Sequence, residues 1–230
     1  MRKLSLISAF LMLALGLSVS AQDCTLYFPS EIGTELTYTN YLKPGKPESS
    51  VKYVVTEKEV KGGETRIGIA AENFDAKGKP ELSYEFNALC KDGVFYVDMR
   101  NMLGSMDIEN FQDFTIEIKD MQFPSNPAPG QQLPDASITL SMTGPISMNM
   151  SVNITNRKIE AIEEITTAAG SFKCFKLTYT SSSAMAFVKT ESKVTEWYAP
   201  NIGSVRSETI NSKSGKLISI SELTSIKAAK

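Results

Sequence analysis

The chain contains no histidine, which restricts the chemistry that its side chains could perform. Without imidazole it lacks the usual general base at neutral pH, every Ser-His-Asp or Cys-His arrangement, and the ligands of most zinc, copper and iron sites. Paired carboxylates, Glu163 with Glu164 or Glu196 with Glu208, are the candidates left for a hydrolase. Adjacent strand residues point to opposite faces, so Glu163 and Glu164 could not flank one bond. We therefore expect a protein that is not an enzyme and needs no cofactor.

Methionine is a second residue type whose spacing allows chemistry, because one residue separates Met148 from Met150. This spacing resembles that of thioether ligands of cuprous copper. The same alternate positions continue through Ile146, Val152 and Ile154, so a stripe of core residues on one strand face is the favoured interpretation. We expect no metal site here. If this face lines a pocket, Met148 and Met150 are candidate ligand contacts.

A third group, Trp197, Tyr198 and Arg206, lies where one strand ends and the next begins. One interpretation is a binding lip, with the two aromatic rings contacting a ligand and Arg206 pairing with an anionic head group. The favoured alternative is a packed strand end, in which Arg206 is paired with Glu196 or Glu208 across the ladder.

The three cysteines are Cys24, Cys90 and Cys174, and none forms a C-x-x-C pair. A thioredoxin-type or zinc site is therefore not supported. In an oxidising compartment we weakly prefer a disulfide between Cys24 and Cys90, which would tie the N-terminus to a core strand. Three buried free thiols are the alternative. Lipidation of Cys24 is disfavoured because Asp23, rather than a small residue, precedes it.

Strands must position these residues, because apolar and polar residues alternate with period 2 over long stretches. The clearest stretches are Leu82 to Cys90 and Ile146 to Thr155, each with one apolar face. Turn sequences such as Lys77-Gly78 and Asn156-Arg157 separate the strands at the spacing of antiparallel hairpins. A helical turn is expected only near Arg100 to Gln112. The sequence thus predicts an all-β fold with little helix, in which roughly a dozen strands form a large antiparallel meander.

A sheet of this size with one apolar face must curl, because a flat sheet would expose that face to water. A barrel, half-barrel or sandwich results, and its inner face is either a filled core or a pocket for an apolar ligand. Residues 124–134 contain four prolines and cannot form a ladder strand. They are either a long loop or a boundary. We favour a single domain over residues 22–230, because neither half has a complete core of its own.

The N-terminal residues 1–21 are typical of a secretory signal peptide. Arg2 and Lys3 precede an apolar run over residues 4–19, and Val19-Ser20-Ala21 is a small-residue cleavage site. After the signal no apolar run approaches the roughly 20 residues that cross a bilayer, so we expect no transmembrane segment. We expect the mature chain, cleaved near Ala21, to be periplasmic or secreted.

Charge argues against a nucleic-acid partner. Removal of the signal leaves 22 basic and 26 acidic residues, a net charge of −4. The basic residues are spread along the chain rather than clustered into a surface that binds phosphates.

Three stretches resemble an exported family of bacterial envelope proteins, the TapB-like family. They are Asp23-Cys24 with Tyr27-Phe28-Pro29, the stretch Ala169 to Lys176, and Thr195 to Glu208 leading into Gly215-Lys216-Leu217. The resemblance implies an exported all-β domain and supplies no reaction. The long strands are also similar to the curved half-barrels of LolA-type carriers, which hold acyl chains on a concave face. The helical lid of those carriers has no counterpart here, and a likeness of fold does not by itself assign function.

These observations predict a non-enzymatic exported protein of the cell envelope that binds a hydrophobic or amphipathic ligand, such as a lipid or apolar small molecule. The alternative is an interaction or assembly module that docks an envelope protein through a sheet edge or the loop Ser125 to Pro134. A carboxylate-based hydrolase is the least favoured of the three, because its two acids must face each other across a substrate.

Overall fold

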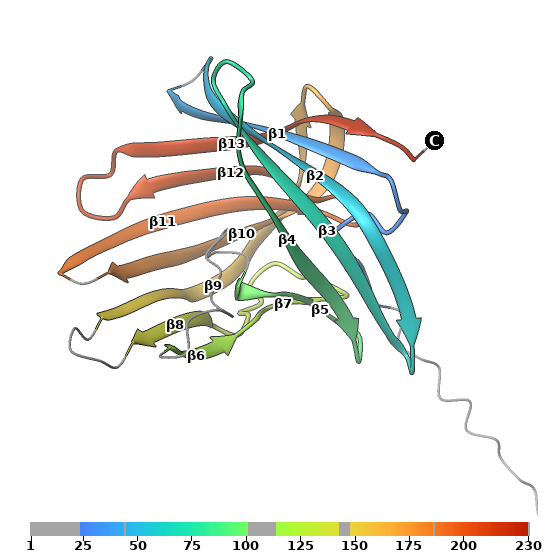
Figure 1. Ribbon diagram of the computed structural model, residues 1–230, viewed down its shortest axis with the longest axis horizontal. Coiled ribbons are helices and arrows are strands. Elements are labelled where there is room, and N and C mark those ends of the chain that lie inside the picture. The colour runs from blue at the N-terminus through green and yellow to red at the C-terminus, as the bar shows by residue number, and fades with distance from the viewer. Residues whose placement is uncertain (1–23, 44, 101–113, 143–147, 186, 230) are drawn as a thin grey trace, which may run out of the picture.

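The structure, a computed structural model, describes residues 24–43, 45–100, 114–142, 148–185 and 187–229. Within them, thirteen strands form one antiparallel sheet (Figure 1). In chain order they are β1 (Glu35–Lys43), β2 (Lys46–Lys61), β3 (Glu64–Asp75), β4 (Pro80–Lys91), β5 (Val94–Val97), β6 (Phe114–Lys119), β7 (Met121–Pro124), β8 (Ala136–Met142), β9 (Met148–Thr167), β10 (Gly170–Met185), β11 (Val188–Ala199), β12 (Gly203–Asn211) and β13 (Leu217–Lys227). The predicted all-β fold of roughly a dozen strands is confirmed.

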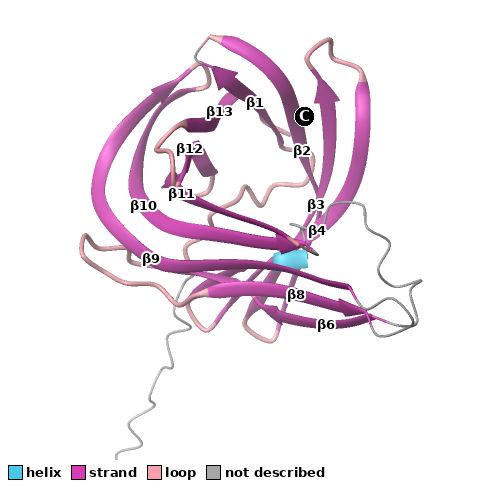
Figure 2. Ribbon diagram, turned by 90° about the vertical axis from the view of Figure 1, so that its left-hand side faces the viewer, coloured by secondary structure: helices cyan, strands magenta, loops and turns pink. Residues whose placement is uncertain are grey.

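The sheet curls into a nearly closed barrel (Figure 2). Its two outermost strands, β6 and β7, follow one another in the chain with only Asp120 between them. Because β6 pairs with β8 and β7 pairs with β5, one bent stretch of chain connects both edges of the sheet. At the bend, the Asp120 carboxylate accepts the backbone N–H of Met99 over 3.0 Å.

Hairpins join most neighbouring strands, as the predicted meander requires. Strands β1 to β5 are consecutive neighbours, as are β8 to β13, and β13 pairs with β1. The meander is interrupted where β6 and β7 enter the sheet. The helical turn expected near Arg100 to Gln112 falls, apart from Arg100, outside the described residues.

The proline-rich segment Ser125 to Pro134 joins β7 to β8 and packs against β9. The Gly130 N–H donates to the Ile159 carbonyl over 2.7 Å, and the Ile159 N–H donates to the Gln131 carbonyl over 2.9 Å. Leu133 is buried in the core. The sheet continues on both sides of this packed loop. The single domain over residues 22–230, with a possible boundary at 124–134, stays a prediction.

Asn156-Arg157 is a bulge inside β9, so the hairpin turn predicted there is wrong. Strand β9 continues to Thr167, and its pairing with β10 shifts register between Thr178 and Thr180. Asn156 has φ 57°, in the left-handed region that asparagine tolerates. The bulge places Arg157 in the core, where its side chain is 1% exposed.

The N-terminal segment 24–30, called the N-terminal plug below, covers one end of the barrel. The ring of Tyr27 contacts four core rings at centroid distances of 5.2 to 6.5 Å, those of Phe95, Phe123, Phe175 and Tyr198. Its hydroxyl donates to the Pro124 carbonyl over 2.9 Å. A disulfide joins Cys24 to Cys90, the pairing preferred from the sequence, and so attaches the plug to β4. Cys174 is a buried free thiol.

The barrel has two different ends, because alternate hairpins of an antiparallel meander turn at the same end. The β2–β3, β4–β5 and β11–β12 turns lie at the plugged end. The β1–β2, β3–β4, β10–β11 and β12–β13 turns lie at the other end, called the hairpin rim below, at the left and top of Figure 1. Ladder pairs near these turns place them side by side, for example Ser49 with Asp75 and Tyr41 with Ile220.

Candidate functional site: a cavity on the inner face

A cavity of about 300 Å³ lies inside the barrel between the N-terminal plug and strands from both halves of the sheet. Most of its lining is apolar, with aromatic residues the largest group, and a smaller part is polar. The aromatic lining consists of Tyr27, Phe28, Tyr38, Tyr53, Phe86, Phe95 and Tyr198, and the polar lining of Glu196, Ser204, Ser207 and Ser221. Binding sites for small molecules typically combine an apolar wall with a few polar groups in this way.

The aromatic wall is a continuous set of edge-to-face ring contacts. Tyr53 lies at its centre, with its ring centroid 6.0 Å from Phe28, 5.5 Å from Tyr38 and 5.7 Å from Phe86. These side chains meet because each occupies an inward position in the alternation of the plug, β1, β2 or β4. Burial raises the pKa of Tyr53 and of Tyr38 well above the ordinary tyrosine value. The wall is therefore uncharged at any physiological pH.

Glu196 supplies the ionisable group of the polar part. Its carboxylate accepts the hydroxyl of Tyr198 over 2.8 Å. Burial raises the pKa of Glu196, while hydrogen bonds from Tyr198, Tyr179 and Ser207 and the charge of Arg157 lower it, with burial the largest effect. The half-buried carboxyl lines the cavity and is withdrawn from bulk solvent. It can therefore offer a hydrogen-bonding group to a ligand in the cavity.

Arg157 lies deeper in the core than the cavity lining, and sequence reasoning missed it because its position was assigned to a turn. Its Nη1 donates to the Pro134 carbonyl over 2.8 Å, and its guanidinium lies 5.1 Å from the centre of the Phe123 ring. Among the described residues its Nε and Nη2 have no hydrogen-bond partner. Burial lowers the pKa of Arg157, against the opposing effects of Tyr198, Tyr179 and Glu196. The positively charged guanidinium therefore attracts negatively charged or electron-rich groups to the interior of the barrel.

The structure does not bring Trp197, Tyr198 and Arg206 together. Tyr198 faces the cavity, whereas Trp197 lies on the other face of β11, packs with Cys174 and donates its Nε1–H to Glu163. Arg206 is the ladder partner of Trp197, so it shares that outer face. It pairs with Glu208 and Glu222. This arrangement matches the favoured interpretation from the sequence, a packed strand end in which Arg206 pairs with Glu208. Glu196 does not pair with Arg206.

The other candidate residues are also separated. Met150 packs against the buried cluster that includes Ile138 and Ile154, away from the cavity lining, and the side chain of Met148 lies outside the described part of the structure. Glu196 faces the cavity, whereas Glu208 pairs with Arg206 on the outer face. Within the described residues, no group of three His, Cys, Asp or Glu side chains could hold a metal ion.

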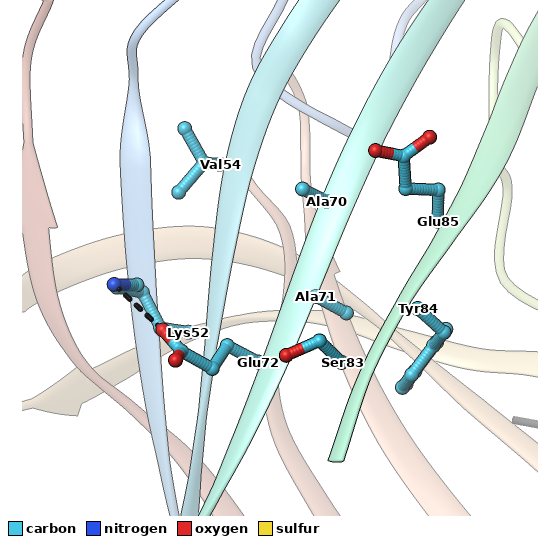
Figure 3. A pocket seen from close by; sticks show the side chains of 8 residues that line it. All are labelled: Lys52, Val54, Ala70, Ala71, Glu72, Ser83, Tyr84 and Glu85. Carbon is cyan, nitrogen blue, oxygen red and sulfur yellow. Dashed lines mark ion pairs between the residues drawn. The ribbon is translucent and has the colours of Figure 1, made fainter. Parts of the chain in front are cut away.

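A second hollow, of about 390 Å³, lies on the outer face of β2, β3 and β4 (Figure 3). Its floor is formed by small side chains such as Ala70 and Ser83, and the ion pair between Lys52 and Glu72, at 3.0 Å, lies at its side. Surface ion pairs of this kind contribute little binding energy. The inner cavity, with its aromatic wall and half-buried carboxyl, is therefore the better candidate site.

Comparisons with known proteins find one matching family and two solved structures of similar fold. The DUF3108-like family matches residues 31–223. A Bacteroides fragilis crystal structure, named for an exported protein of YmcC-like fold, has 28% identity and a TM-score of 0.73, and covers 89% of this chain and 100% of its own. A Parabacteroides distasonis structure named as a lipoprotein has 25% identity and a TM-score of 0.74, and covers 90% and 100%. No curated protein matches. The TapB-like and LolA-type resemblances are not confirmed.

Proposed function

This chain belongs to the DUF3108-like family, and we propose that it is an exported, non-enzymatic envelope protein that binds an amphipathic ligand in the cavity of its barrel. The relatives named as an exported protein and a lipoprotein support the exported location. In the described residues, no helix is long and apolar enough to span a membrane. The predicted signal peptide over residues 1–21 lies outside the described residues.

The observation that carries the proposal is the division of the cavity into an aromatic wall and a polar part. The rings of Tyr53 and Phe86 offer apolar contact, while Glu196 and Ser221 offer hydrogen-bond partners. An apolar ligand portion would gain roughly 25 cal/mol for each Å² buried against the rings. The polar part would orient the head group of the ligand. Glu196 lines the cavity, whereas Glu208 pairs with Arg206 on the outer face, so these two carboxylates could not flank one substrate.

The proposal is tested with an uncharged fluorescent probe, N-phenyl-1-naphthylamine, added to the purified mature protein. We expect saturable fluorescence enhancement, and a loss of at least about tenfold in affinity for Ser221→Phe, because the new ring fills the cavity. Ser83→Phe is the matched control, because Ser83 lies on the outer face of β4. Equal affinities in the two variants would place the probe elsewhere and contradict the proposal.

Mass spectrometry of protein purified natively from its own envelope supplies the second test. We expect a stoichiometric apolar or amphipathic molecule in the organic extract of the wild-type protein and its loss from Ser221→Phe. A wild-type sample that is free of such a molecule and does not bind the probe would reject the ligand-binding function.

Docking of a protein partner is the alternative function, and the edge strand β6 is the feature that favours it. Ile116 and Ile118 are exposed on β6, which is the terminal strand of the sheet and pairs on one side with β8. The loop Ser125 to Pro134, the other docking element expected from the sequence, is occupied by its pairing with β9. Pull-down from envelope extract with an Ile116→Lys, Ile118→Lys variant tests this alternative, which predicts loss of a specific partner.

A further inference from the structure

The hairpin rim carries exposed apolar side chains together with lysines, and we propose that it docks the protein onto an anionic lipid surface. This proposal concerns the outside of the molecule and does not depend on what the cavity holds. It rests on three observations, namely the apolar tip of one hairpin, the charge of the neighbouring turns, and the position of these turns at a single end of the barrel.

The described residues on both sides of the β10–β11 turn are apolar and exposed to solvent. Phe187 is fully exposed, at 101%, and its neighbours Val188 and Met185 are exposed by 65% and 56%. Leu42 at the end of β1 and Leu217 at the start of β13 add exposed apolar side chains on two adjacent hairpins. These side chains add nothing to the core. Apolar residues gathered on a projecting surface are typical of interaction sites.

The neighbouring turns are basic, although the chain as a whole is acidic. Their exposed lysines are Lys46, Lys77, Lys79, Lys213 and Lys216. Asp75, the acidic residue at the base of the β3–β4 turn, is turned back to accept the backbone N–H groups of Lys77 and Lys79 at 2.8 and 2.9 Å. Other acidic residues of these hairpins lie on the strands, farther from the turns than the lysines do. They are Glu48, Glu81 and Glu191. At the plugged end, by contrast, Lys91 pairs with Glu64.

A lipid surface fits this rim better than a folded protein partner. The apolar side chains stand on separate hairpins rather than forming one continuous patch, whereas a stable protein interface needs roughly 1,000 Å² of complementary contact. A bilayer interface accommodates separate insertions, and its anionic head groups attract each nearby lysine. Phe187 would enter the interface while the lysines of the adjacent turns contact phosphates.

Flotation of the purified mature protein with vesicles tests the proposal. We expect binding to vesicles of phosphatidylethanolamine with phosphatidylglycerol, weaker binding to phosphatidylcholine, and a further decrease when salt is raised. Phe187→Ser should lower the partition coefficient at least about fivefold, because an aromatic insertion is lost. Val60→Ser is the matched control, because Val60 is 67% exposed at the plugged end, and it should bind as the wild type does.

Charge reversal separates the electrostatic contribution from insertion. Lys213→Glu should weaken binding to the anionic vesicles by roughly fivefold or more and leave binding to phosphatidylcholine unchanged. Lys61→Glu, at the end of β2 beside the β2–β3 turn at the plugged end, is its control. A wild-type protein that does not float with anionic vesicles would overturn the proposal, as would equal binding by Phe187→Ser and Val60→Ser. All four substitutions are at exposed positions, and circular dichroism verifies that each variant is folded.

Discussion

Glu196 shows how the environment of one residue changes its role. Its position in the sequence allows it to pair with Arg206 across a ladder, yet Arg206 pairs with Glu208 and Glu222 on the outer face. The signal that could have placed Glu196 inside is its position two residues from Tyr198 and from Val194, both of which are buried. Burial then makes Glu196 a weaker acid than a surface glutamate.

Replacement of Glu196 by glutamine should remove a pH-dependent loss of stability. The raised pKa means that the folded protein holds the proton more tightly than the unfolded chain, so stability falls as pH rises above the ordinary value of 4.5 toward the raised pKa. We expect Glu196→Gln to gain stability relative to the wild type as pH rises through this window. Urea unfolding at several pH values measures it, with exposed Glu81→Gln as control. Parallel pH profiles for wild type and Glu196→Gln would contradict it.

The N-terminal plug is the element that closes one end of the barrel and completes the cavity. Its backbone approaches the β11–β12 turn closely, because Asn201 donates its N–H to the Leu26 carbonyl over 2.7 Å. A β-carbon at Gly203 would lie 2.9 Å from the carbonyl oxygen of Tyr27. Gly203 also has φ +104°, a conformation that side chains disfavour. The plug can therefore pack here only because residue 203 lacks a side chain.

Gly203→Ala should destabilise the protein by about 2–3 kcal/mol, because backbone strain and displacement of the plug act together. Gly215→Ala is the control. It also replaces a glycine of positive φ, at +66°, but no atom lies within 4 Å of the new β-carbon, so we expect a loss of about 1 kcal/mol. Chemical denaturation compares the two variants. Equal losses would mean that contact with the plug contributes nothing at residue 203.

At the scale of the whole molecule, the disulfide between Cys24 and Cys90 connects residues 66 positions apart and holds the plug against the barrel. We expect Cys24→Ser to lower the free energy of unfolding by about 2–4 kcal/mol, because the unfolded chain gains conformational freedom. Urea unfolding of the oxidised proteins measures this difference, and the difference should shrink under reducing conditions. An unchanged midpoint in the oxidised variant would contradict the expectation.

The sequence alone determined the class of fold and part of the chemistry. Period-2 alternation specifies which residues of a strand share a face, so the strands and their one-sided apolar character could be predicted locally. The composition likewise determined the absence of imidazole chemistry. Predictions failed where the local pattern allowed two structures, as at Asn156-Arg157, where a bulge and a turn call for the same residue types.

Only the tertiary structure decided how the barrel closes and what its inner face contains. Closure depends on β6 and β7 pairing with strands far apart in the sequence, and no local pattern encodes such pairing. The burial of Arg157 and the cavity beside Glu196 follow from the path of the closed sheet. The placement of Trp197 and Tyr198 on opposite faces, by contrast, follows from strand alternation and could have been predicted. Whether an apolar face becomes filled core or cavity depends on the volume that the closed sheet encloses, and strand periodicity does not specify that volume.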